Sequence, residues 1–163
     1  MRFNRILIPL DGSALAESAL AKAEEMAGAW PSTLMLLRAA EVYTLPGADP
    51  IEAQVQVVRE AEEYLATVAT RLKAQGFRNV ETSVWYGPAA SAIVEAAHVR
   101  KADLIVMSTH GRSGLGRLIL GSVAESVLRG TATPILLLRA PEAPVEKPRG
   151  SGTARPTKEP SHA

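Results

Sequence analysis

The chain has 163 residues, of which 47% are hydrophobic and 21% charged, and its 18 Lys and Arg nearly balance its 17 Asp and Glu. This length is enough for one domain with a real core, and the composition excludes a fully disordered chain. The absence of cysteine excludes disulfides, thiol catalysis and thiolate metal sites. A net charge of +1 gives no reason to expect nucleic acid or an anionic membrane as the main partner.

The apolar patterning does not predict a membrane protein. The longest apolar runs, such as Leu34–Leu37 and Leu104–Met107, fall far short of the roughly 18 residues that indicate a membrane span. The early apolar stretch is interrupted by Pro9 and Asp11, so it does not have the form of a secretory signal. We therefore predict a cytoplasmic protein.

The composition changes after residue 140. Residues 141–163 hold five of the eleven prolines and almost no large apolar side chain. A segment of this kind cannot bury enough apolar surface to offset the entropy lost on ordering it, so we predict a disordered tail. The tail contains four basic and three acidic residues, which leaves residues 1–140, the predicted domain, without net charge.

Strands and helices are predicted to alternate along the domain. The first strand ends at Pro9, which has no N–H to donate to a sheet, and Asp11 or Ser13 can cap the helix that follows. In chain order the predicted elements are strand 3–10, helix 14–29, strand 33–40, helix 50–75, strand 79–86, a helix opening at Gly87-Pro88, strand 103–108, helix 122–129 and strand 134–139. The residues of the second helix that fall at helical spacing, and should be buried, are Ala61, Leu65, Val68, Ala69 and Leu72. This order is typical of the α/β class, with an open parallel five-stranded sheet, right-handed crossovers and helices on both faces.

Two of the predicted strand ends carry unusual residues. Asp11 follows the first strand, and a glycine-rich loop over 109–120 follows the fourth. Parallel sheets bind ligands outside the carboxyl ends of their strands, where the strand order reverses. If the first and fourth strands are neighbours, both features line one crevice.

The glycine-rich loop has the parts of a phosphate site. Its small residues let the backbone approach an anion, and Gly121-Ser122 presents N–H groups at the start of a helix. Arg112 and Arg117 supply positive charge nearby. It is not a Walker A loop, because the chain has no Gly-Lys-Ser/Thr, and Ile119 stands where the dinucleotide fingerprint has its last small residue.

The same residues have alternative explanations. Ser122 to Glu125 matches a capping box, which requires no ligand, and the glycines also suit a plain surface loop. A Ser-His-Asp hydrolase built on Asp11, His110 and Ser122 is disfavoured because the Gly-x-Ser-x-Gly elbow is absent. A phosphoacceptor receiver domain is disfavoured because Trp85-Tyr86-Gly87 stands where it needs an aspartate. Three scattered histidines do not predict a transition-metal site.

Three segments carry a resemblance to a known family, namely ILIPLDGS, ADLIVMSTHGRSGLGRLILGSVAESVLR and TPILLL. On these segments the chain resembles the universal stress protein family, in its ATP-binding branch, over residues 3–140. The nucleotide motif of that family is Gly, two residues, Gly, nine residues, then Gly-Ser/Thr. Gly111, nine residues and Gly121-Ser122 match the motif, and Ser108 stands at its first position.

The resemblance implies a Rossmann-like fold of the adenine nucleotide alpha hydrolase type that binds ATP, with Mg²⁺ as a companion ion. It implies that Asp11 contacts the ribose hydroxyls and that Pro9 and Ala39 border the adenine. Residues 107–111, which include Met107 and Ser108, would follow the nucleoside and the α-phosphate. The residues that would hold the terminal phosphates are Gly121, Ser122 and Val123.

We predict an ATP-binding stress-response protein whose nucleotide state regulates an output. Hydrolysis should be slow at most, because no residue is placed as a general base. Two alternatives stay open: a dimeric adaptor in which nucleotide is only structural, and a true ATPase or phosphotransferase. The unbroken apolar strand Ile135–Leu138 ends the domain and suits a sheet edge, which predicts a homodimer, as the resemblance also implies.

Overall fold

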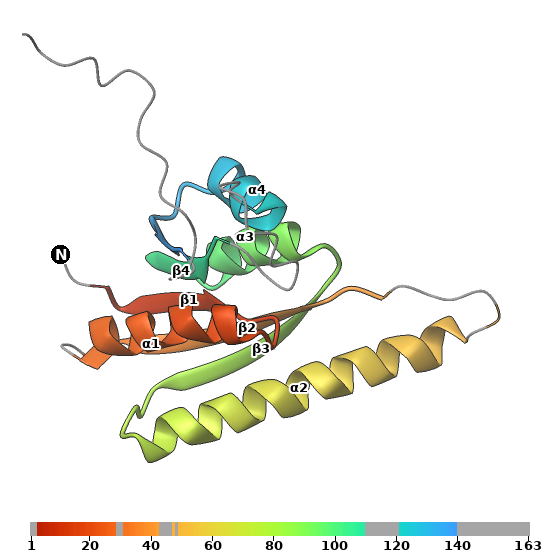
Figure 1. Ribbon diagram of the computed structural model, residues 1–163, viewed down its shortest axis with the longest axis horizontal. Helices are drawn as coiled ribbons and strands as arrows, with labels where there is room; N and C mark the ends of the chain where they lie inside the picture. The colour runs from red at the N-terminus through yellow and green to blue at the C-terminus, as the bar shows by residue number, and fades with distance from the viewer. Residues whose placement is uncertain (1–2, 29–30, 43–46, 48, 110–120, 140–163) are drawn as a thin grey trace, which may run out of the picture.

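A computed structural model describes residues 3–28, 31–42, 47, 49–109 and 121–139, and in these ranges strands and helices alternate as predicted (Figure 1). The strands are β1 (Arg5–Pro9), β2 (Thr33–Ala40), β3 (Val80–Tyr86), β4 (Leu104–Ser108) and β5 (Ile135–Leu138). The helices are α1 (Ala14–Gly28), α2 (Pro50–Ala74), α3 (Ala89–Val99) and α4 (Ser122–Gly130). Most of the predicted glycine-rich loop and the predicted tail lie outside the described residues.

The strands form one parallel sheet in the order β3-β2-β1-β4-β5. From β1 the chain first builds outward through β2 and β3, and then returns to place β4 on the other side of β1. The strand order therefore reverses between β1 and β4, which are neighbours as the crevice prediction requires. The predicted α/β class and sheet are confirmed, and β5 lies at an edge.

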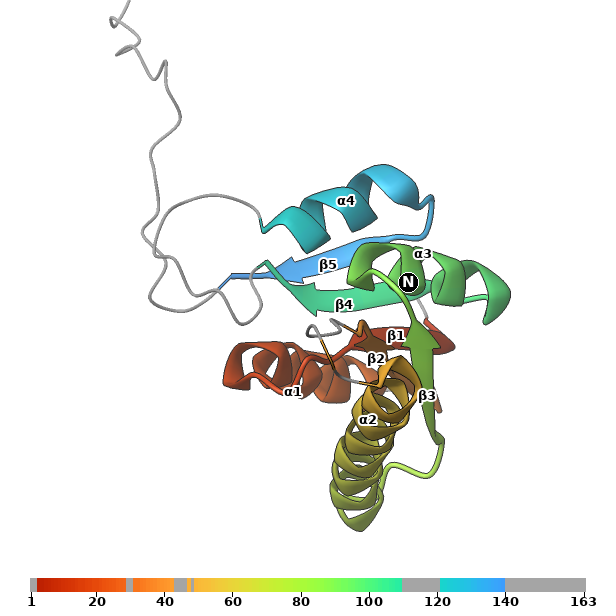
Figure 2. The same ribbon diagram turned by 90° about the vertical axis from the view of Figure 1, so that its right-hand side faces the viewer.

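Helices cover both faces of the sheet because successive strand residues point to opposite sides (Figure 2). On β1, Ile6 and Ile8 pack in the core beneath α1 and α2, whereas Leu7 packs in the core beneath α3 and α4. All three side chains are buried. Both faces of the central strands are therefore apolar, as expected of a parallel sheet covered on two sides.

Helix α2 is fixed at its start by a polar cap and along its second half by the sheet. The Asp49 side chain accepts a hydrogen bond from the N–H of Ile51 at 2.8 Å, and Pro50 occupies the first turn. Its buried residues are those that the helical spacing predicts: Ala61, Leu65, Val68, Ala69 and Leu72. Before them the helix extends past the body of the molecule (Figure 1), where Ile51 is 74% exposed.

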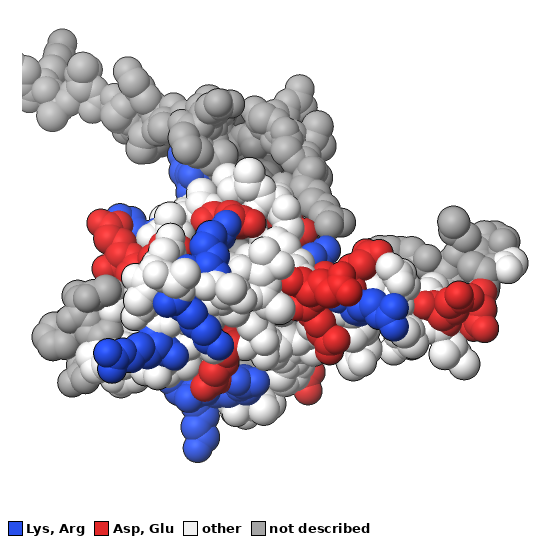
Figure 3. Space-filling model, turned by 90° about the horizontal axis from the view of Figure 1, so that it is seen from below, with Lys and Arg blue, Asp and Glu red and all other residues white. Residues whose placement is uncertain are grey.

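Charged side chains of both signs are interspersed on the face of the molecule that α2 forms (Figure 3). At the amino-terminal ends of the strands, Arg5 and Arg100 both pair with Glu81. Asp103 accepts hydrogen bonds from the N–H groups of Asn4 and Arg5, at 2.7 and 3.0 Å. These contacts tie β1 to the loop before β4 at the end of the sheet opposite the predicted crevice.

Candidate functional site

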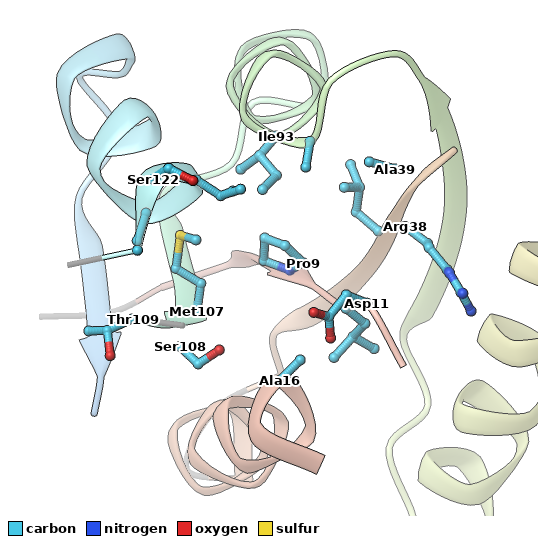
Figure 4. Close-up of a pocket in the computed structure, with 16 residues that line it drawn as sticks. Pro9, Asp11, Ala16, Arg38, Ala39, Ile93, Met107, Ser108, Thr109 and Ser122 are labelled. Atoms are coloured by element: carbon cyan, nitrogen blue, oxygen red, sulfur yellow. The ribbon is translucent and has the colours of Figure 1, made fainter. Parts of the chain in front are cut away.

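A cavity of about 350 Å³ opens at the carboxyl ends of β1, β2 and β4, as the crevice prediction requires (Figure 4). Eight of the ten residues predicted to bind nucleotide line it: Pro9, Asp11, Ala39, Met107, Ser108, Gly121, Ser122 and Val123. The other two, Gly111 and Arg112, lie outside the described residues. Thr109, which falls in the predicted stretch 107–111, also lines the cavity. The lining residues that sequence reasoning did not assign to the site are Leu10, Ala16, Leu37, Arg38, Ala89, Ile93 and Ala124.

Asp11 is held at the cavity by the turn that starts α1. Its Oδ1 accepts hydrogen bonds from the N–H of Ser13 at 2.9 Å and from the Ser13 hydroxyl at 2.6 Å. The Ser13 oxygen in turn accepts from the N–H of Ala16 at 3.1 Å, so Ser13 is the side chain that caps the helix. Both bonds that Asp11 accepts from described residues end on Oδ1, which leaves Oδ2 to accept a hydrogen bond from a ligand.

The first turn of α4 lies at another side of the cavity. The expectation that the Gly121 N–H faces an anion is wrong, because this N–H donates to the Thr109 carbonyl at 2.8 Å. The Glu125 N–H donates to the Gly121 carbonyl at 2.9 Å. The N–H groups of Ser122, Val123 and Ala124 fall in the first turn, where a helix has no internal acceptor for them. Because these three residues line the cavity, the positive end of the helix dipole favours an anion there.

The capping-box explanation of Ser122 is wrong. The N-cap position is Gly121, which has no side chain, and Ser122 is the first residue inside the helix. The sequence match to a capping box is out of register by one residue, because the Gly121 carbonyl is already the first acceptor of the helix. The start of α4 is therefore not closed by a side chain of its own.

The walls between Asp11 and α4 are mostly apolar. They are formed by Pro9 of β1, Ala39 of β2, Ile93 of α3 and Met107 of β4 (Figure 4). These apolar walls, of which Ala39 and Pro9 are the most compact, suit a flat apolar group. The cavity therefore joins an apolar section to a carboxylate at one side and a set of helix N–H groups at the other.

Among the lining residues that sequence reasoning did not assign to the site, Arg38 is the charged one. It is half-buried on β2, and its guanidinium lies 5.0 Å from the centre of the Tyr64 ring on α2. The Tyr64 hydroxyl donates to Glu17 Oε1 at 3.1 Å, and Arg71 donates to Glu17 Oε2 at 2.8 Å. The sequence feature that could have indicated this residue is the arginine itself, because the strand TLMLLRAA is otherwise almost entirely apolar.

This arrangement has a measurable consequence for Tyr64. Burial, followed by the charge and hydrogen bond of Glu17, raises the pKa of Tyr64 to about 12. A raised folded-state pKa adds stability that is full below the ordinary tyrosine value of about 10 and is lost as the pH rises toward 12. We expect Tyr64→Phe to remove a phenolate absorbance that develops near pH 12. If Tyr64→Phe instead removes a phenolate absorbance that develops near pH 10, this result would contradict the burial of Tyr64 and its hydrogen bond to Glu17.

The described ranges contain no group of three or more His, Cys, Asp or Glu side chains placed to hold a metal ion. In those ranges, too, no helix is both long and apolar enough to cross a membrane.

Comparisons with known proteins agree on one family. The family described as the universal stress protein family matches residues 2–139. Universal stress protein MJ0531 of Methanocaldococcus jannaschii is 32% identical over 145 residues, which cover 86% of this chain and 84% of that protein. The solved structure of hypothetical protein MJ0577 matches with a TM-score of 0.78 at 25% identity, covering 86% of this chain and 98% of that one. A universal stress protein in complex with cAMP matches with a TM-score of 0.57 at 30% identity, covering 85% and 98%.

Proposed function

The chain belongs to the universal stress protein family, and on this premise we propose that it binds ATP in the cavity beside β1 and β4 and acts as a nucleotide-dependent regulator. The observation that carries the proposal is the junction of three surfaces in one cavity: the Asp11 carboxylate, the apolar walls and the N-terminus of α4. A nucleoside triphosphate carries one group for each of these surfaces, namely ribose hydroxyls, a flat base and a chain of phosphates.

The phosphates are assigned to the α4 end. Ser122 and Val123 supply N–H groups, and the Ser122 hydroxyl supplies a further donor. The Gly121 N–H bonds to Thr109, so Gly121 serves by leaving space rather than by donating. Gly111 remains part of the proposed site through the family motif, and Arg112 remains part of it as a nearby positive charge.

The nucleoside is assigned to the end at Asp11. Asp11 Oδ2 would accept a hydrogen bond from a ribose hydroxyl, while Pro9 and Ala39 would border the adenine. Met107 and Ser108 line the cavity between the two ends and would contact the nucleoside and the first phosphate.

Mg²⁺ is proposed as a companion of the phosphates. It usually keeps several waters and binds substrate phosphates with only one or two carboxylates. Mg²⁺ held in this way does not need a cluster of three or more metal-binding side chains, and the described ranges hold none. When bound, the ion would neutralise phosphate charge, while Ser122 and Val123 position the phosphate chain.

The direct test is calorimetry of the whole chain with ATP and Mg²⁺, together with mass spectrometry of small molecules released when freshly purified protein is denatured. We expect saturable ATP binding and a released adenine nucleotide. A parallel titration with cAMP asks whether this chain shares the ligand of its relative. Absence of binding heat, with no displacement of a fluorescent ATP analogue, would overturn the proposal.

Asp11→Asn is expected to weaken ATP binding by roughly 10–100-fold, because a hydrogen bond to a charged group contributes about 1.5–3 kcal/mol. Asparagine keeps an oxygen that can accept from Ser13, so the turn that starts α1 is preserved. Unchanged ATP affinity in a folded Asp11→Asn protein would contradict the placement of the ribose. A Glu62→Gln variant, altered on the exposed side of α2, is the matched control.

We also propose that the regulator is a cytoplasmic homodimer joined through β5. The four residues Ile135–Leu138 are only half-buried, and β5 forms a sheet edge beyond β4. An apolar edge strand of this kind favours pairing with another chain. Light scattering at micromolar concentration should give the mass of a dimer, and a monomer would contradict the interface.

Capture of protein partners with and without ATP separates a regulator from an adaptor, and steady-state turnover tests for an ATPase.

A further inference from the structure

One charged side chain of the cavity has no role in the ATP site as assigned above. Among the described lining residues, Arg38 is the one lysine or arginine. It lies at the end near Asp11 with its guanidinium directed out of the cavity toward α2, whereas the start of α4 lies across the cavity (Figure 4). Arg38 is therefore near the nucleoside end of a ligand, which its guanidinium would reach by turning from Tyr64, and far from the phosphates assigned to α4.

The guanidinium of Arg38 is not neutralised by a described carboxylate. Its recorded contact is with the face of the Tyr64 ring, at 5.0 Å. Glu17, the acid beside that ring, already accepts from Tyr64 and from Arg71. Within the described part of the chain, the N–H donors of Arg38 thus remain available for an anionic ligand.

The chemistry of an arginine beside a ribose identifies the ligand class. A guanidinium binds a phosphate through two parallel hydrogen bonds, and an arginine near the ribose is the group that accommodates a ribose phosphate in dinucleotide sites. We propose that this end of the cavity accepts adenine nucleotides that carry an additional phosphate on the 2′ or 3′ oxygen of the ribose. Arg38 is the specificity-determining residue, and the inference rests on the proposed nucleotide site.

The local charges explain why Arg38 would decide this preference. The carboxylate of Asp11 repels a second phosphate on the ribose, so binding of such a ligand requires a compensating cation. Arg38 leaves only a cation–π contact when it turns toward the ligand, and at a half-exposed site this contact is weak. Tyr64 stays in place because its hydroxyl is bonded to Glu17.

The test compares AMP with adenosine 3′,5′-bisphosphate and adenosine 2′,5′-bisphosphate, which differ from AMP only by the ribose phosphate. Affinities are measured by displacement of a fluorescent ATP analogue from the whole chain. We expect at least one bisphosphate to bind tenfold or more tightly than AMP. Arg38→Gln should remove this preference while it changes the AMP affinity less than threefold, and Arg38→Lys should keep part of it.

Each outcome of this test is informative. If ATP and AMP bind but neither bisphosphate is preferred, or if the preference survives in Arg38→Gln, the role of Arg38 is overturned and the ATP site stands. If no nucleotide binds, both proposals fail together. Circular dichroism checks that the Arg38 variants are folded. Tyr64→Phe keeps the ring beneath Arg38 and should retain the preference.

Discussion

Gly121→Val is expected to abolish ATP binding, with a loss of at least about 100-fold in affinity, because several hydrogen bonds to the phosphates are blocked at once. Gly121 lines the cavity directly before the first turn of α4. Its backbone angles, φ −57° and ψ 147°, are accessible to valine, so the helix start and the N–H bond to Thr109 persist. The added isopropyl group then occupies the space beside the N–H groups of Ser122 and Val123.

The matched control is Ser126→Val, which adds a β-branched apolar side chain to the same helix at an exposed position outside the cavity. Gly121→Ala, which adds one methyl group, should give an intermediate loss. Calorimetry with ATP measures the affinities, and circular dichroism checks the fold. ATP binding by folded Gly121→Val within threefold of the wild type would show that the phosphates do not lie at the start of α4.

The fold was predictable because local patterns and tertiary packing agree. The buried face of α2 is the set at helical spacing that begins at Ala61, since this helix covers the sheet along one side only. β4 reads as the continuous apolar run LIVMS because both of its faces are covered. The sequence left the neighbouring placement of β1 and β4 as a condition, which the sheet meets, and this placement brings Asp11 to the same cavity as Ser122.

The parts that could not be predicted depend on contacts between distant residues or on a shift of one position. Arg38 faces Tyr64 only because α2 packs over β2, and no local pattern reports that contact. Glu17 and Tyr64 are 47 positions apart in the chain. The start of α4 differs from the capping-box expectation by a single residue, since either Gly121 or Ser122 suits an N-cap by residue type.

The near-zero net charge is compatible with an anion site of this construction. Helix N–H groups act over the first turn and carry no formal charge, so they do not appear in a count of lysines and arginines. The one described cation of the cavity, Arg38, lies away from α4. Composition therefore could not indicate the proposed phosphate end, whereas the spacing from Gly111 to Gly121-Ser122, which resembles the family motif, predicts it.

Leu36→Ala is expected to lower the free energy of unfolding by about 2–5 kcal/mol, the usual cost of removing a fully buried leucine and leaving a cavity. Leu36 has 0% exposure at the centre of β2, where it pairs with Ile8 of β1 and Thr82 of β3. Urea denaturation measures the loss. Leu36→Met, which conserves volume, should cost less than about 1.5 kcal/mol, and a cost for Leu36→Ala no larger than this would contradict the packing.

Leu36→Ala and Gly121→Val should separate an effect on the free energy of unfolding from an effect on ATP binding. Leu36 does not line the cavity, so ATP at 100 times its Kd should add about 2.7 kcal/mol to the free energy of unfolding of Leu36→Ala, as in the wild type. Gly121→Val should retain most of the stability of the ligand-free protein and gain nothing from ATP, because the substitution acts on the binding surface. If ATP fails to stabilise folded Leu36→Ala, then the sheet core and the cavity are coupled, and the rigid scaffold assumed for the site is incorrect.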